Sequence, residues 1–267
     1  MVVTRANTTK NYADIAASKI RKPRERPLSI LAYGRNKKGK TRFCTTAGKV
    51  LILDPEDGTD QFVKAAPDVW PVSSWQDLND AYKYLSTAKH GYDYVALDGM
   101  TRFSNMALRY VMNLEEERDI SRTPGLVQQR DYGKAGELMK GLLYNIHALP
   151  VGAIYTAQER QVEGEFTEED DEVDTATVQY VPDMPKGIRT VVNSIVDVIG
   201  RLYTVRQELD DDRVVTRHRM WLAPSPLYDT GARSEYRLPD FLPSPTVPRL
   251  VQLVNEGKVG TNGSRKS

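Results

Sequence analysis

The segment LSILAYGRNKKGKT, residues 28–41, constrains this chain more than any other, because it joins an apolar run to the pattern G-x-x-x-x-G-K-T. Gly34 and Gly39 permit backbone angles that side chains disfavour, so that successive N–H groups can turn toward phosphate oxygens. Lys40 can then reach the β- and γ-phosphates, and the Thr41 hydroxyl can ligate Mg²⁺. The pattern predicts a phosphate-binding loop between a strand and a helix, with ATP and Mg²⁺ as ligands.

The loop is also unusually basic, which strengthens triphosphate binding at low ionic strength. We predict that the loop and the residue after it contact the nucleotide: Gly34, Arg35, Asn36, Lys37, Lys38, Gly39, Lys40, Thr41 and Arg42. A basic surface turn that matches the pattern by chance is the alternative interpretation.

Composition limits the class of protein. The 267 residues carry 37 basic and 36 acidic side chains, a net charge of +1, so any attraction to nucleic acid must come from local patches. Charge is segregated between a basic N-terminal arm and an acidic run at residues 163–174. The single cysteine, Cys44, excludes disulfides within the chain and favours a reducing, cytoplasmic setting, and we expect it to be buried. No apolar run approaches the roughly 20 residues that cross a bilayer, so no membrane partner is expected.

Hydrophobic patterning predicts an α/β fold. Apolar runs typical of buried parallel strands lie at residues 28–33, 50–54, 92–100 and 149–158, with a short strand at 69–72. Helical periodicity occupies residues 74–89, 103–117 and 134–149, and a last helix is expected at 246–257. Residues 194–205 and 213–223 are typical of an antiparallel pair. The alternation predicts a mostly parallel central sheet flanked by helices, with antiparallel strands toward the C-terminus.

This pattern gives one domain, at residues 27–257. A basic arm precedes it at 1–26, a long acidic loop interrupts it at 159–186, and a flexible tail follows at 258–267.

Acidic residues at strand ends are candidates for the chemistry. Asp98 ends a buried strand, where a second Mg²⁺ contact beside Thr41 is required, although a plain turn aspartate is the alternative. Hydrolysis also needs a carboxylate that orients water, for which Asp54 and Glu56 are candidates. Gln158 lies at the carboxyl edge of the sheet, where it can sense the γ-phosphate or simply end a strand.

These elements, in this order, resemble the RecA core. The resemblance covers about residues 28–205 and is carried by GRNKKGKT, LILDPED, YDYVALD and IYTAQE. It implies a RecA-like P-loop ATPase in which Lys40 and Glu56 are catalytic and Gln158 couples the nucleotide state to a DNA-binding loop.

More narrowly, the chain resembles phage-encoded RecA-like ATPases of the Sak-four group of single-strand annealing proteins. That likeness is carried by YDYVALDGMTRF, DYGKAGELMKGLLYNIHALP and YRLPDFLPSP. It implies DNA recombination, repair or replication in the host cytoplasm, with single-stranded DNA as partner and a homo-oligomeric ring or filament as the working form. A phage single-strand binding protein is a further expected partner.

The resemblance places two DNA-facing loops at residues 118–133 and 159–186. Arg118, Arg122 and Arg130 in the first suit phosphates, whereas the carboxylates of the second should repel them. Arg233 is a candidate to reach the γ-phosphate of an adjacent subunit.

The three histidines, at positions 90, 147 and 218, have no metal-ligand spacing and are interpreted as structural. Two other functions remain open: an annealing module that uses ATP for assembly, and a P-loop kinase.

Overall fold

The computed structural model describes residue 20 and residues 26–163, 178–209 and 213–259. The predictions for most of the N-terminal arm, for nearly all of the acidic run and for residues 260–267 of the tail fall outside these residues.

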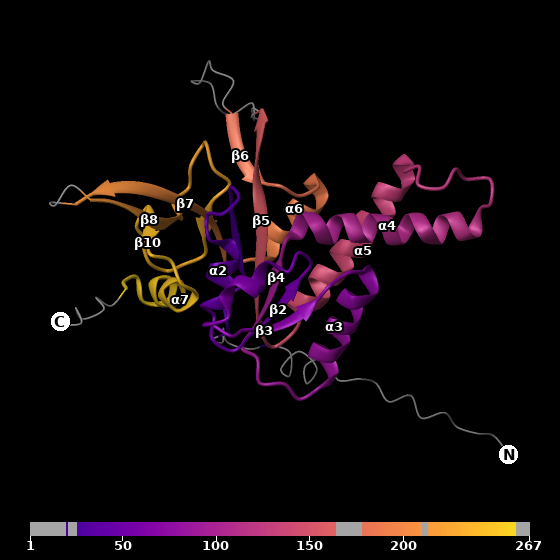
Figure 1. Ribbon diagram of the computed structural model, residues 1–267. Helices are drawn as coiled ribbons and strands as arrows, with labels where there is room; N and C mark the ends of the chain where they lie inside the picture. Colours follow the sequence, from indigo (N-terminus) through magenta and orange to yellow (C-terminus); the bar gives the residue numbers. More distant parts are fainter. Residues whose placement is uncertain (1–19, 21–25, 164–177, 210–212, 260–267) are drawn as a thin grey trace, which may run out of the picture.

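One sheet organises the described residues (Figure 1), in the order β10-β8-β7-β1-β5-β4-β2-β3, with β6 paired to β5 and β9 to β7. The strands are β1 (Ile30–Gly34), β2 (Val50–Asp54), β3 (Asp68–Pro71), β4 (Tyr94–Asp98), β5 (Gly152–Glu163), β6 (Val178–Pro182), β7 (Val198–Glu208), β8 (Val214–Trp221), β9 (Gly231–Ala232) and β10 (Phe241–Pro243). Neighbours from β3 to β7 are parallel, and β8 and β10 add antiparallel pairs. The predicted α/β fold class is therefore confirmed.

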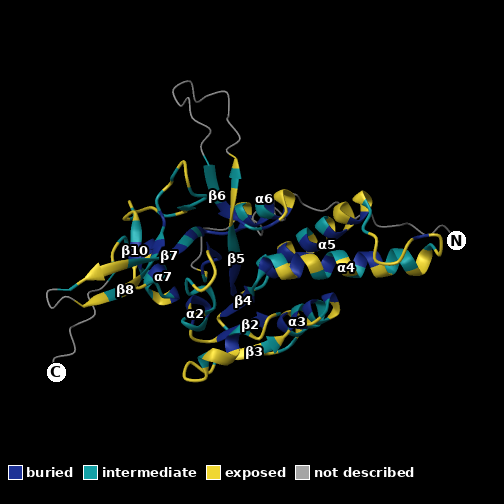
Figure 2. Ribbon diagram, turned by 45° about the horizontal axis from the view of Figure 1, so that its top comes forward, coloured by how far each residue is buried: buried dark blue, intermediate teal, exposed yellow. Residues whose placement is uncertain are grey.

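Helices cover both faces of this sheet, as Figure 2 shows. They are α2 (Lys40–Thr45), the short 3-10 helix η1 (Gly58–Phe62), α3 (Trp75–Thr87), α4 (Met100–Arg118), α5 (Gln129–His147), α6 (Lys186–Ile195) and α7 (Val247–Glu256). A hydrophobic core lies on each face of the sheet. Successive residues of β1 contribute to the two cores in turn, because side chains alternate between the faces along a strand. Leu31 and Tyr33 pack with α3 to α6, whereas Ile30 and Ala32 pack with α2 and α7.

Local sequence signals explain several boundaries. Ser74 caps α3 by accepting a hydrogen bond from the backbone of Asp77, as expected from the Ser-x-x-Asp spacing. Thr246 caps α7, and Gly257 ends it in the left-handed conformation. Cys44 is buried as predicted, and burial raises the pKa of its thiol. No helix in the described ranges is both long and apolar enough to span a membrane.

Two predicted loops are wrong. β5 does not end at Gln158 but continues to Glu163, because its extension pairs antiparallel with β6 and so satisfies its backbone groups. Residues 159–163 and 178–182 of the expected loop are thus paired strands, and residues 164–177 lie outside the described part.

The loop expected at 118–133 is shorter, because α5 begins at Gln129 behind a capping box between Gln128 and Asp131. α4 and α5 form a helical hairpin that projects from the body (Figure 1).

Candidate nucleotide-binding site

The predicted phosphate-binding loop connects β1 to α2. Gly39 and Lys37 lie in the left-handed region, with φ of 94° and 60°, which turns the backbone sharply before the helix. Gly34 is required by packing, because a Cβ at this position would lie 2.3 Å from the carbonyl oxygen of Leu202. Strand β7 therefore lies directly against the start of the loop, and both glycines of the pattern have a structural reason.

Lys40 lies inside this loop. Its Nζ donates hydrogen bonds to the carbonyl oxygens of Gly34 and Arg35, at 3.0 and 3.1 Å. Burial lowers the pKa of the ammonium, and the carboxylates of Asp98, Glu56 and Glu159 oppose that effect. A cation within a ring of backbone groups, surrounded by carboxylates, suits the β- and γ-phosphates and their metal.

A carboxylate and two hydroxyls meet beside Lys40. Asp98, at the end of β4, accepts a hydrogen bond from Thr41 Oγ1 at 2.6 Å and from Thr156 Oγ1 at 2.5 Å. Burial raises the pKa of Asp98, and the two hydroxyl donors oppose this shift. Mg²⁺ prefers oxygen ligands and keeps several waters, so the hydroxyl of Thr41 and the carboxylate of Asp98 fit this ion.

A pocket of about 410 Å³ gathers the candidate catalytic residues, with Lys40, Thr41, Glu56, Asp98 and Gln158 all in its lining. These residues come from β5, from the end of β4, and from the segments that follow β1 and β2. The carboxyl ends of parallel strands meet at one edge of a sheet, which explains why separate motifs converge there. Glu56 is exposed, and its Oε1 lies 3.6 Å from Arg102 Nε.

Asp54, the other candidate carboxylate, has a structural role. It is buried and accepts hydrogen bonds from the backbone N–H groups of Glu56 and Thr59 and from the Thr59 hydroxyl. Burial alone would raise the pKa of Asp54, but these hydrogen bonds outweigh it and lower the pKa. Asp54 thus holds the turn that presents Glu56.

A family model described as an AAA domain matches residues 26–234. The chain belongs to the AAA domain family. A search of curated proteins found no match. Among solved structures, a KaiC-like protein from the archaeon Pyrococcus horikoshii OT3 is similar at 14% sequence identity and a TM-score of 0.39, over 73% of this chain and 78% of that one. The family match and the site together define a nucleotide-binding domain of the P-loop ATPase type.

The other predicted nucleotide contacts of this AAA domain divide into two groups. Asn36, Lys37 and Arg42 line the pocket together with the loop residues already described. The side chains of Arg35 and Lys38 have partners within the chain, since Arg35 Nε lies 3.3 Å from Glu159 and Lys38 Nζ donates to Thr204 Oγ1 at 2.8 Å.

Several residues that line the pocket were missed from the sequence, among them three polar ones: Thr156, Arg102 and His218. Thr156 precedes Gln158 by two positions in β5, and residues two apart in a strand lie on the same face. The alternation of side chains along the strand could therefore have identified Thr156. Arg102 lies in the first turn of α4, four residues after Asp98. His218, interpreted as structural, lines the pocket, with Nδ1 3.3 Å from the carbonyl oxygen of Lys38. No local pattern places His218 there, because β8 reaches the loop only through the fold.

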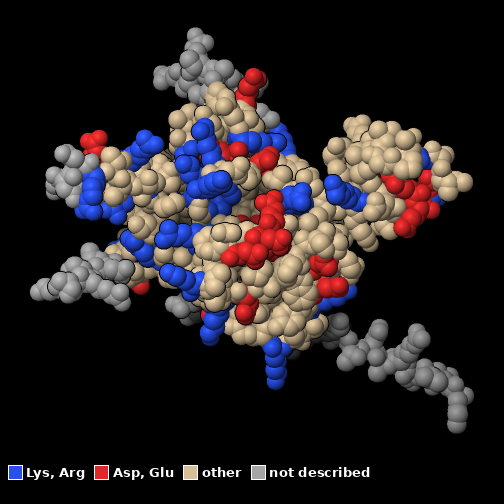
Figure 3. Space-filling model, in the orientation of Figure 1, with Lys and Arg blue, Asp and Glu red and all other residues tan. Residues whose placement is uncertain are grey.

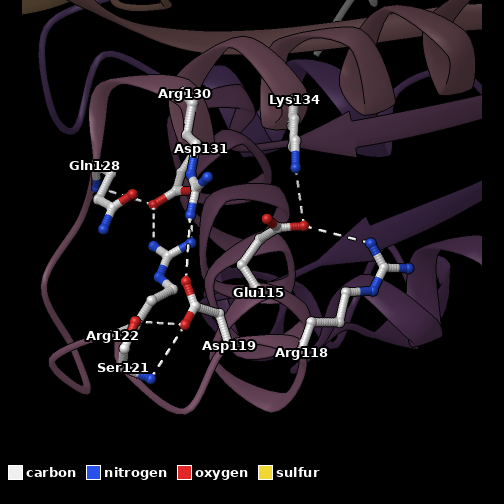
Figure 4. A network of polar contacts seen from close by, with 9 residues as sticks. All are labelled: Glu115, Arg118, Asp119, Ser121, Arg122, Gln128, Arg130, Asp131 and Lys134. Atoms are coloured by element: carbon white, nitrogen blue, oxygen red, sulfur yellow. Dashed lines mark hydrogen bonds and ion pairs between the residues drawn. The ribbon is translucent and has the colours of Figure 1, made fainter.

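Of the predicted DNA contacts, Arg122 is wrong (Figure 4). Its guanidinium is covered by the surrounding chain and donates two hydrogen bonds to the carboxylate of Asp131, at 3.1 and 2.5 Å. The hydrogen bond from Arg122 lowers the pKa of Asp131. This pair joins the connection between α4 and α5 to the first turn of α5, so it is a structural brace.

Arg118 and Arg130 remain exposed, with partners in Glu115 and Asp119, and their DNA role stays a prediction. Arg233 lies at the opposite edge of the sheet, near the start of β7, and its Nη2 donates to the carbonyl oxygen of Ser194 at 2.7 Å. Its action on an adjacent subunit also stays a prediction.

Proposed function

We propose that this protein is an Mg²⁺-dependent ATPase whose turnover is coupled to single-stranded DNA, in the manner of phage-encoded recombination and replication proteins. A homo-oligomeric ring or filament is the proposed working form. The observation that carries the ATPase part is the convergence of Lys40, Asp98, Glu56 and Gln158 on one pocket. A site that only binds a nucleotide has no need of Glu56 at its edge.

The roles of these residues follow from their positions. Lys40 stabilises negative charge on the β- and γ-phosphates, and Thr41 with Asp98 would hold Mg²⁺, which when bound would supply positive charge beside the phosphates. Glu56 orients a water molecule and takes its proton as the water oxygen attacks the γ-phosphorus. The bond to the bridging oxygen breaks, and ADP leaves.

Gln158 connects the nucleotide pocket to residues of neighbouring elements. Its carbonyl oxygen accepts a hydrogen bond from the backbone of Asp183 at 2.8 Å, and the Asp183 carbonyl oxygen accepts one from Thr101 Oγ1 at 2.6 Å. Gln158 lines the pocket, and beyond it β5 continues as the strand that pairs with β6. These contacts support the proposal that Gln158 couples the nucleotide state to surfaces outside the pocket.

An ATPase assay with and without single-stranded DNA tests the proposal. We expect DNA to stimulate hydrolysis several-fold, and Lys40→Ala to abolish both basal and stimulated rates. Hydrolysis that is indifferent to DNA would contradict the coupling, and hydrolysis that survives in Lys40→Ala would contradict the site.

Glu56→Gln separates an ATPase from a module that uses ATP only for assembly. The variant should bind ATP with unchanged affinity and lose at least about a hundredfold in turnover, as expected for loss of a general base. If DNA annealing by Glu56→Gln equals that of the parent, hydrolysis is not part of the function.

A further inference from the structure

A second hollow lies beside the nucleotide pocket, between the start of α3 and one face of α4. It has a volume of about 840 Å³ and reaches the α4–α5 connection at Gly125 and Val127. Trp75, Met106 and Tyr110 contribute its apolar lining, and the rings of Trp75 and Tyr110 lie 6.4 Å apart. We call this hollow the α4 groove.

One polar stripe of α4 lines the groove. Arg102, Asn105, Arg109 and Asn113 follow one another at spacings of three and four residues, which places them on one side of a helix. All four are exposed. Within the described ranges the side chains of Asn105, Arg109 and Asn113 have no hydrogen bond or ion pair. The stripe therefore presents one guanidinium group, that of Arg109, and two amides that the described fold does not use, next to Arg102, whose guanidinium faces Glu56.

The groove meets the nucleotide pocket at Arg102, which lines both. Arg102 Nε lies 3.6 Å from Glu56 Oε1, and both side chains are about half exposed. An anion that enters the groove can therefore compete with Glu56 for this guanidinium. The candidate catalytic carboxylate is thereby linked to a surface outside the pocket.

The donors of the groove suit a single-stranded nucleic acid. Seven residues separate Arg102 from Arg109, or about 10 Å along the helix. Arginine binds phosphate oxygens, asparagine amides can pair with base edges, and apolar and aromatic side chains support unstacked bases. Figure 3 shows basic side chains where the α4–α5 hairpin leaves the body, acidic ones nearer its tip, and a further group of acidic side chains at the centre of the same face.

We propose that the α4 groove binds single-stranded nucleic acid, and that its phosphate draws Arg102 away from Glu56 and so frees the carboxylate to orient water. The inference rests on the proposed function and names the surface and the residue through which the strand stimulates hydrolysis. It differs from the predicted DNA contacts at Arg118 and Arg130, which lie farther out along the hairpin.

Binding is tested by fluorescence anisotropy with labelled thymidine and uridine oligonucleotides, which separate DNA from RNA. Arg109→Ala and Arg102→Ala should each weaken binding at least threefold and make the salt dependence shallower by about 0.7 in log–log slope, as expected for one lost phosphate contact. Lys83→Ala removes an exposed cation of α3 outside the groove and is the matched control. It should bind the oligonucleotide as the parent does, and thermal unfolding should show all three variants folded.

Hydrolysis tests the role of Arg102. Without oligonucleotide, Arg102→Ala should hydrolyse ATP faster than the parent, and its stimulation by oligonucleotide should fall toward onefold. A slower basal rate would show that Arg102 merely holds Glu56 in place and would overturn the release step.

Three results of the binding assay would overturn the groove. Parent-like binding by Arg109→Ala and Arg102→Ala overturns the groove alone, while the proposed ATPase stands. A parent protein that hydrolyses ATP but binds no oligonucleotide overturns the groove together with the nucleic-acid part of the proposed function. Binding of an acidic peptide in preference to oligonucleotide, lost in the same variants, assigns the groove to a protein partner instead.

Discussion

At the residue scale, His147 at the end of α5 predicts a pH dependence of stability. Burial lowers the pKa of this imidazole, Arg26 and Arg233 lower it further, and Asp197 opposes them. Its buried Nδ1 has no hydrogen-bond partner among the residues that the structure describes. The unfolded chain then binds the extra proton first, so stability falls as pH drops below 6.5 toward the folded pKa. In urea titrations at several pH values, His147→Gln should remove this fall in the free energy of unfolding below pH 6.5. An unchanged dependence on pH would show that another group causes the loss of stability.

At the element scale, helix α5 carries glycines that no contact requires. A Cβ at Gly133 or Gly141 would meet no atom within 4 Å. Glycine in a helix interior costs about 0.5–1 kcal/mol relative to alanine, so the double change to alanine should stabilise the protein by about 1–2 kcal/mol in chemical denaturation. Gly34→Ala is the opposite case, because its Cβ would clash with Leu202, and it should be strongly destabilising. A double variant no more stable than the parent would contradict the prediction that these glycines destabilise α5.

At the scale of the whole molecule, the nucleotide pocket lies among four parallel strands and α2, so ligand binding should stabilise the complete fold. ATP with Mg²⁺ at a hundred times its dissociation constant should add about 2.7 kcal/mol to the free energy of unfolding. Thermal unfolding should show this shift for the parent and for Glu56→Gln, and Lys40→Ala should lose most of it. A full shift in Lys40→Ala would place the nucleotide outside the pocket.

Much of the site could be predicted because its residues stand at fixed distances along the chain from strong local signals. The glycine pattern located Lys40 and Thr41. Glu56 and Asp98 were located because each lies at or just after the end of a buried apolar run. Gln158 was placed at the correct edge, although the strand was expected to end there. That error arose because the pairing of β5 with β6 depends on a segment some 20 residues later, which the local pattern of β5 does not contain.

Residues that join the site through the fold could not be predicted. Arg102 and His218 carry no motif, and Arg122 was misread because an arginine in a polar segment gives no sign of a buried carboxylate partner. Composition alone left Asp54 and Glu56 as alternatives, and the RecA resemblance favoured Glu56. The hydrogen bonds that Asp54 accepts from Thr59 show why Asp54 forms the turn, whereas Glu56 is exposed and faces Arg102.

The sequence by itself determined the phosphate-binding loop, the α/β class and the order of most strands and helices, because the glycine pattern and hydrophobic periodicity are local signals. It did not give β6, α6, β9 or β10. The tertiary structure decided which side chains share a pocket, since strand order and register set the distances between residues far apart in sequence. It placed Thr156 against Asp98, His218 against the loop, and Arg102 between Glu56 and the α4 groove. The chemistry at the phosphates follows from the motif, whereas the link from that chemistry to an outer surface exists only in the folded chain.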